Sequence, residues 1–314
     1  MADPDERGSD TTRLSTVADA TPIIERFRRK DPSLSAAIPV TIDGQQVTVV
    51  NPPAPPSPWT SLTRLTVAAE LLDIVNNPRR INQGPFNLCG PSAFWVIVAA
   101  RHPKAFATAA TDLFDTGRGS VGGLNIAPST SLMSTDFPAI VARRAAANHS
   151  TATTQTEWML ISALQNSTPS IGPAWDGQPE SGWSGIALPS NLESWFNSTG
   201  LFSSVKADTN VVVPGTRFVH NLTLGNGQDH VLLIDGAILE APPKDWKEKI
   251  ASLFGTANHW VLLTDHAEMD ASSRTINLGI WTWGGTRPKS EARETFDIDL
   301  FTSNYYGAVS VKVG

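Results

Sequence analysis

Apolar positions recur with a helical period in the first two-thirds of the chain and with a strand-like period in the last third. Between residues 61 and 165 apolar side chains return every three or four residues, which predicts helices. After residue 200 they tend to alternate with polar ones, as in half-buried strands. Helices are expected over residues 90–101, 103–114, 136–148, 154–165 and 242–254, and strands over residues 201–205, 216–224, 230–238, 259–265, 275–283 and 308–313. The pattern therefore predicts an α+β fold in which a helical half precedes a mostly antiparallel sheet half.

The first 60 residues follow neither pattern. Residues 1–35 are polar, apart from a short helix predicted over Thr21–Arg29, and a two-stranded hairpin is expected around Asp43-Gly44. The proline-rich run 51–58 must be extended, because successive prolines lack backbone donors and disfavour helix. Residues 117–134, rich in Gly, Ser and Thr, are expected to form a long loop. Three parts are thus predicted: a loosely held N-terminal arm with a strap (1–60), a helical lobe (61–200) and a sheet lobe (201–314).

Composition narrows the function classes. With 40% hydrophobic and 17% charged residues among 314, the chain can form an ample core, and its net charge of −6 gives no reason to expect nucleic acid or membrane as partner. No run approaches the roughly 18 apolar residues of a membrane span, and the N-terminus does not resemble a signal peptide. Synthesis in the cytoplasm is expected, with any export by a route that needs no cleaved signal. No metal or cofactor motif is present, so neither is predicted.

The single cysteine, Cys89, lies where an apolar helix is expected to begin. Unpaired N–H groups and the positive end of the helix dipole favour a thiolate there and lower the cysteine pKa. A lone cysteine in such a helix is otherwise most often a buried hydrophobic residue. Gln83 changes that interpretation, because a side-chain amide six residues earlier can bind a developing oxyanion together with the backbone N–H of Cys89.

The run from Gln83 to Trp95 resembles the papain-like cysteine peptidases. In motif style it is closest to bacterial members, which include peptidases that remove double-glycine leaders and papain-like secreted effector toxins. The resemblance implies a helical lobe that carries the nucleophile, packed on an antiparallel sheet lobe. It also implies a histidine at the start of a strand, acting first as general base and then as general acid.

His259 matches that histidine best, and His230 is the alternative because it also opens an apolar strand. His259 is favoured since the segment 280–285 that follows it resembles the family's Asn-Ser-Trp-Gly element. This alignment puts Trp281 at the position of the family's asparagine, and an indole cannot accept a hydrogen bond from an imidazole. The group that orients the histidine is therefore open: Asn277, Asp270, a backbone carbonyl, a water, or none in a Cys-His dyad.

The resemblance implies a cysteine peptidase in which Cys89 attacks an amide carbonyl, His259 moves the proton, and Gln83 helps to bind the oxyanion. The expected partner is a protein or peptide substrate, with glycine-rich cleavage sites as one specificity. The protein is expected to act as an interbacterial toxin, which an immunity protein inhibits in the cell that produces it. Two alternatives use the same fold: a glutamine deamidase or transglutaminase acting on a target protein, and a non-catalytic binding module.

Overall fold

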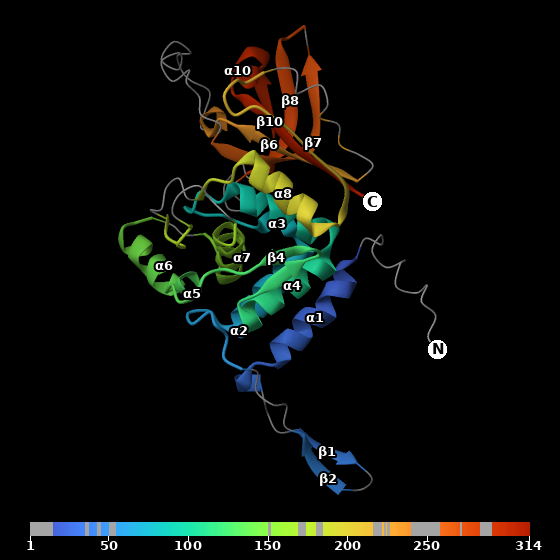
Figure 1. Cartoon of the computed structure of the whole chain (residues 1–314), viewed down its shortest axis with the longest axis vertical. Coiled ribbons are helices and arrows are strands. Elements are labelled where there is room, and N and C mark those ends of the chain that lie inside the picture. Colours follow the sequence, from blue (N-terminus) through green and yellow to red (C-terminus); the bar gives the residue numbers. More distant parts are fainter. Residues whose placement is uncertain are drawn as a thin grey trace.

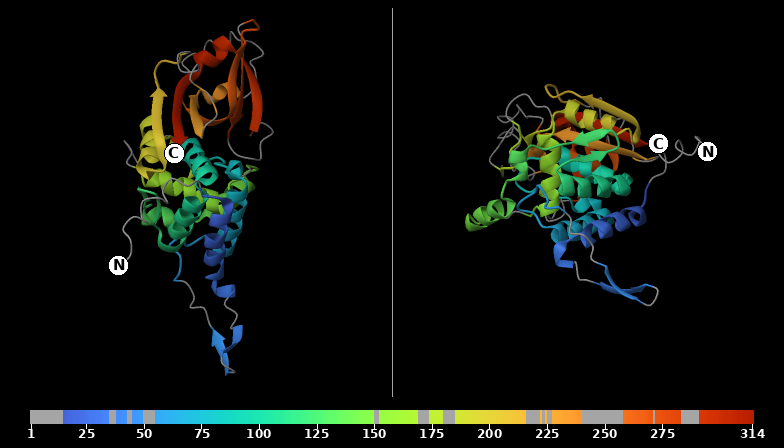
Figure 2. Two further views of the ribbon diagram at one scale, coloured as in Figure 1. Left: turned by 90° about the vertical axis from the view of Figure 1, so that its right-hand side faces the viewer. Right: turned by 60° about the horizontal axis from the view of Figure 1, so that its bottom comes forward.

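The computed structural model describes residues 15–34, 38–42, 45–49, 55–149, 152–168, 174–179, 185–215, 222, 224, 227–239, 258–270, 272–282 and 291–314. Over these residues the fold is mixed α+β, with nine α-helices and antiparallel sheets. A six-stranded sheet lies at one end of an elongated molecule, most helices form the middle, and a small hairpin projects at the opposite end (Figures 1 and 2).

The helices lie mainly in the first two-thirds of the chain. They are α1 (Val17–Arg29), α2 (Arg64–Asn76), α3 (Cys89–Arg101), α4 (Pro103–Thr116), α5 (Thr130–Met133), α6 (Phe137–Ala146), α7 (Gln155–Asn166), α8 (Pro189–Thr199) and α10 (Ile298–Ser303), with short 3-10 turns η2 (Pro32–Leu34), η3 (Pro78–Arg80) and η6 (Gly236–Leu239). The four helices expected between residues 90 and 165 are confirmed within two residues at each end.

The strands are β1 (Ile38–Ile42), β2 (Gln45–Val49), β3 (Gly119–Val121), β4 (Leu124–Ile126), β5 (Phe202–Thr209), β6 (Gln228–Ile234), β7 (His259–Asp270), β8 (Thr275–Trp281), β9 (Glu291–Asp297) and β10 (Tyr305–Val313). The main sheet has the order β5-β10-β6-β7-β8-β9, and every neighbouring pair is antiparallel. The predicted hairpin is confirmed as β1 paired with β2.

Helix α3 is the centre of the helical lobe, where it contacts α2, α4, α7 and α8 as well as strand β7. Every residue from Cys89 to Ala99 is buried, as expected for a helix that is apolar on all sides. Pro91 is tolerated because the first turn has no intrahelical partner for its missing N–H. The sequence therefore forces the N-terminus of α3 against the sheet.

Each face of the main sheet packs in a different core. Along β6, Val231 and Leu233 join the core shared with the helices, while Leu232 and Ile234 join a second core around Phe296 and α10. Strand β7 follows the same alternation. Burial on both faces explains why these strands are continuously apolar in sequence.

The N-terminal segment differs from the loosely held arm expected for it. Helix α1 buries Ala20, Ile24 and Phe27, which are spaced to share one face. Phe27 meets Phe114 of α4 edge to face at 5.3 Å between ring centroids, and the Arg64 guanidinium lies over both rings. A narrow apolar stripe in a mostly polar segment was enough to join α1 to the helical lobe.

Other expectations also change. The loop expected over residues 117–134 contains the hairpin β3–β4 and helix α5, and β9 was not expected. The strand expected over 230–238 ends at Ile234 and gives way to η6. The helix expected over 242–254 and nearly all of the strand expected over 216–224 lie outside the described residues.

Candidate active site

Cys89 is the first residue of α3, and its sulfur meets the start of β7. The backbone N–H of Trp260 donates a hydrogen bond to Cys89 Sγ at 3.3 Å. The Trp260 indole N–H reaches the carbonyl of Ala187 at 2.8 Å, which fixes this end of the strand. Because Trp260 directly follows His259, the backbone of that histidine lies beside the sulfur.

The Cys89 thiol is enclosed, with 5% of the residue exposed. Burial raises the pKa of Cys89 to about 11, against the opposing effect of N–H groups from Trp260, Gly90 and Cys89 itself. The expectation that the helix N-terminus lowers this pKa is therefore wrong, because the desolvation of a buried anion outweighs those donors. In this environment the sulfur is a thiol, and any thiolate must form as its proton passes to a base.

His259 is the first residue of β7 and is 6% exposed. Its Nε2 lies 2.6 Å from Oγ1 of Thr282, a residue that directly follows β8 and is 1% exposed. Turn η6 packs behind the histidine, since a Cβ placed on Gly236 would lie 3.2 Å from His259 Cβ. The ring is thus held by a buried hydroxyl from the neighbouring strand.

Thr282 is the orienting candidate that the sequence did not reveal. The Trp281 indole N–H donates to the Arg79 carbonyl at 2.5 Å, so this side chain faces the helical lobe. The next residue, Thr282, faces the other side of the sheet, as His259 does. The sequence held one signal for this role, namely a hydroxyl-bearing residue one position after the family's asparagine position.

Asn277 and Asp270 do not take that role. Asn277 Oδ1 accepts a hydrogen bond from Thr295, and the Asp270 carboxylate caps the turn that follows it. Both pair near the far end of the β7–β8 hairpin. Asp270 is eleven residues along β7 from His259, or about 35 Å at the usual rise per residue.

Gln83 lies in the loop that leads into α3 and is 4% exposed. Gly84 and Asn87 have positive φ angles of 55° and 53°, so the loop turns sharply around the glutamine. The buried Oε1 of Gln83 has no hydrogen-bond partner in the part of the chain that the structure describes. A buried amide oxygen left in this way is costly, and a catalytic role is one of the explanations for such a group.

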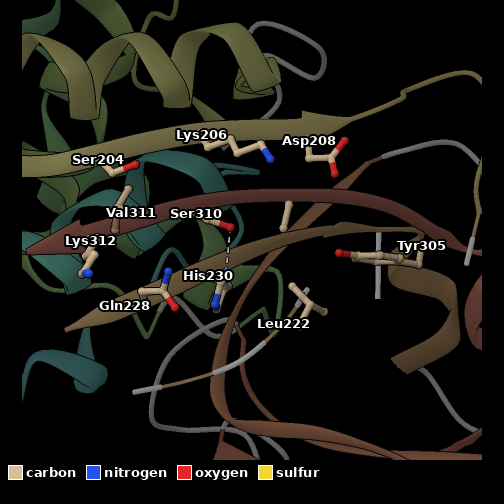
Figure 3. A pocket seen from close by; sticks show the side chains of 11 residues that line it. Ser204, Lys206, Asp208, Leu222, Gln228, His230, Tyr305, Ser310, Val311 and Lys312 are labelled. Atoms are coloured by element: carbon tan, nitrogen blue, oxygen red, sulfur yellow. Dashed lines mark hydrogen bonds between the residues drawn. The ribbon is translucent and has the colours of Figure 1, made fainter. Parts of the chain in front are cut away.

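His230, the alternative histidine, lies elsewhere on the sheet. Its Nδ1 is 2.7 Å from Ser310 Oγ on β10, in a polar cavity of about 290 Å³ that Lys206 and Lys312 also line (Figure 3). Ile234 pairs with His259, and His230 is four residues further along β6, or about 13 Å. The structure therefore brings the backbone at His259, rather than His230, to the cysteine, while the His259 ring lies on the face of the sheet opposite the helical lobe.

Comparisons of the chain with protein-family models, with curated proteins and with solved structures find no match. Among the described residues, no three His, Cys, Asp or Glu side chains gather closely enough to hold a metal ion. None of the helices described is both long and apolar enough to cross a bilayer.

Proposed function

We propose that the protein is a papain-like cysteine peptidase that cleaves peptide bonds with Cys89 and His259. The hydrogen bond of 3.3 Å from the Trp260 N–H to Cys89 Sγ is the observation that supports this most. It joins the start of the histidine strand to the N-terminus of the only helix that carries a cysteine. The buried pair of His259 and Thr282 adds a fixed imidazole one residue before Trp260.

The proposed chemistry begins with the tautomer of His259. When Nε2–H donates to Thr282 Oγ1, the lone pair is on Nδ1, which serves as the base. In the proposed reaction the His259 ring reaches the sulfur around the start of β7, and Nδ1 takes the thiol proton as the Cys89 sulfur attacks the carbonyl carbon of the substrate. The oxyanion is bound by the Gln83 side-chain N–H and the Cys89 backbone N–H.

Collapse of the tetrahedral intermediate breaks the C–N bond, and His259 gives its proton to the leaving amine. The resulting thioester is attacked by water, with Nδ1 accepting a proton from it. Cys89 then leaves and regains a proton from His259, which restores both groups. Since the pKa of Cys89 is raised to about 11, thiolate formation depends on the imidazole at neutral pH.

The decisive experiment is N-terminal mapping of bacterial proteins incubated with the purified protein or with its Cys89→Ala variant. New N-termini should form only with the wild type. A mass increase of about one unit on intact chains would instead indicate glutamine deamidation. If a folded wild type produces neither new N-termini nor this mass increase, the non-catalytic binding module is the remaining alternative.

The proposed biological role is that of a toxin that acts on proteins of a neighbouring bacterium, with an immunity protein as its inhibitor. Expression in the bacterial cytoplasm should slow growth for the wild type and leave it unchanged for Cys89→Ala. Equal growth of the two strains at equal protein levels would contradict the toxin role while leaving the peptidase chemistry open to the mapping experiment.

A further inference from the structure

A buried carboxylate, Glu157, lies directly behind the loop that carries Gln83. Glu157 is the third residue of α7 and is 2% exposed. Its Oε2 accepts the backbone N–H of Thr154 at 2.7 Å, and Thr154 Oγ1 accepts the N–H of Glu157 in return. This is a capping box at the start of a helix. The second oxygen does something the cap does not require: Oε1 accepts the backbone N–H of Asn82 at 3.1 Å.

Residues at the start of α7 and just before it therefore contact the chain on both sides of Gln83. Before it, Asn82 is bound by Glu157, and its own Oδ1 accepts the N–H of Gly84 at 2.8 Å. After it, Gly84 packs so closely on Thr153 that a Cβ there would lie 2.1 Å from the threonine Oγ1. Gln83 therefore has little freedom to move, although its own side-chain oxygen has no partner among the described residues.

We infer that Glu157 is a positioning residue, which holds the Gln83 amide in the oxyanion site through the backbone of Asn82. The inference rests on the proposed function, because Gln83 needs a fixed position only if an oxyanion forms beside Cys89. A carboxylate suits this task because each of its oxygens can accept one N–H. A glutamine at 157 would turn an NH₂ group toward one of the two backbone donors.

The charge of this carboxylate responds to pH near neutrality. Burial raises the pKa of Glu157 to about 7, with a further rise from Glu70, while the N–H groups of Thr154 and Asn82 oppose the shift. Glu70 is the charged neighbour, and it accepts the N–H of Thr156 at 2.8 Å from helix α2. Lowering the pH through 7 protonates one oxygen of Glu157, which weakens its hydrogen bond from a backbone N–H and loosens the loop. The catalytic rate should fall as the Gln83 loop loosens.

Stability responds in the opposite direction. A carboxyl group whose pKa is raised on folding binds its proton more tightly in the folded state than in the unfolded state. Its contribution to the free energy of unfolding is fully present below its ordinary pKa of 4.5 and is lost as the pH rises through about 7. At lower pH we therefore expect a looser Gln83 loop together with a larger contribution of Glu157 to the free energy of unfolding. Simple acid unfolding would not produce this combination.

The first measurement needs no catalysis. In full-length Cys89→Ala protein labelled with ¹⁵N-asparagine, the Asn82 amide signal should titrate with a midpoint near pH 7. Glu70→Gln should move that midpoint to lower pH, because it removes the repulsion that raises the Glu157 pKa. A flat Asn82 signal between pH 5.5 and 8.5 would overturn the inference whether or not any variant of Glu157 folds.

The second measurement uses a peptide that the wild type cleaves. We expect kcat to fall as the pH drops through 7 with KM unchanged. Glu157→Gln should lower kcat about 10- to 100-fold at pH 8, less than the roughly 100- to 1,000-fold that removing an oxyanion donor itself costs. The limb near pH 7 should vanish in that variant, and Glu193→Gln serves as the matched control. Full kcat in a folded Glu157→Gln protein would overturn the positioning role. An Asn82 titration without any cleavage would instead reject the proposed function and leave the contact between Glu157 and the loop intact.

Discussion

His259 and His230 have nearly the same local surroundings. Each is buried in the main sheet, and each has a ring nitrogen within 2.7 Å of a hydroxyl from a neighbouring strand, Thr282 in one case and Ser310 in the other. They differ in what lies next to them in the fold, since the backbone N–H of the residue after His259 donates a hydrogen bond to Cys89. Burial and a hydroxyl partner are therefore common features of a sheet histidine, and the neighbouring nucleophile distinguishes the candidate catalytic one.

Exchanging each histidine for alanine is the strongest way to break this comparison. His259→Ala should lower kcat/KM by about 10³-fold, because a general base contributes roughly that much. His230→Ala should change it less than threefold, and steady-state cleavage of one peptide by both variants is the measurement. Equal losses in two folded variants would mean that the sheet histidines act through stability alone.

The hydroxyl partners of the two histidines test the same comparison through a smaller expected effect on kcat. Thr282→Val keeps the side-chain shape but removes the hydrogen bond to His259, and kcat should fall about three- to tenfold for a bond worth roughly 1 kcal/mol. Thr282→Ser should restore most of the rate. Ser310→Ala removes the corresponding partner of His230 and should leave kcat unchanged, which makes it the matched control. A Thr282→Val enzyme with full activity would exclude the threonine as the orienting group.

The smallest expected effect concerns the buried thiol beside His259. A cysteine whose pKa is raised on folding contributes stability below its ordinary pKa of 9.0, and this contribution is lost as the pH rises through about 11. The free energy of unfolding of the wild type, relative to Cys89→Ala, should therefore fall by about 1 kcal/mol between pH 8 and pH 10. Urea denaturation of both proteins at the two pH values measures this double difference. An unchanged difference would mean that the thiol is not desolvated.

The sequence was most informative where one residue type has one dominant physical role. Gly90-Pro91 suits the first turn of a helix, and α3 begins at Cys89 as expected. The apolar run after residue 258 likewise predicted β7. The lone cysteine could be linked to Gln83 because motif spacing is a local property, and to His259 through the resemblance of the segments around residues 259 and 280–285. Whether these residues catalyse a reaction stays a prediction.

Features that depend on distant packing could not be predicted in the same way. The orienting group was sought at Asn277 and Asp270, because the sequence does not show which of Trp281 and Thr282 faces the histidine. That choice depends on which side of the sheet the helices cover. A helix over Thr21–Arg29 was predicted, but its packing on the helical lobe was not, since Phe27 packs against Phe114 and Arg64, which lie far along the chain. The direction of the Cys89 pKa shift likewise reflects how completely the folded chain excludes water from the sulfur.

The hydrogen bond between Cys89 and Trp260 joins residues that are 171 positions apart. During translation the helical lobe, with its cysteine, leaves the ribosome long before strand β7 is made. A lobe that folds first, as N-terminal segments generally do, would carry a thiol without its histidine. Nascent and truncated chains that end before residue 259 would then lack the proposed Cys89–His259 pair.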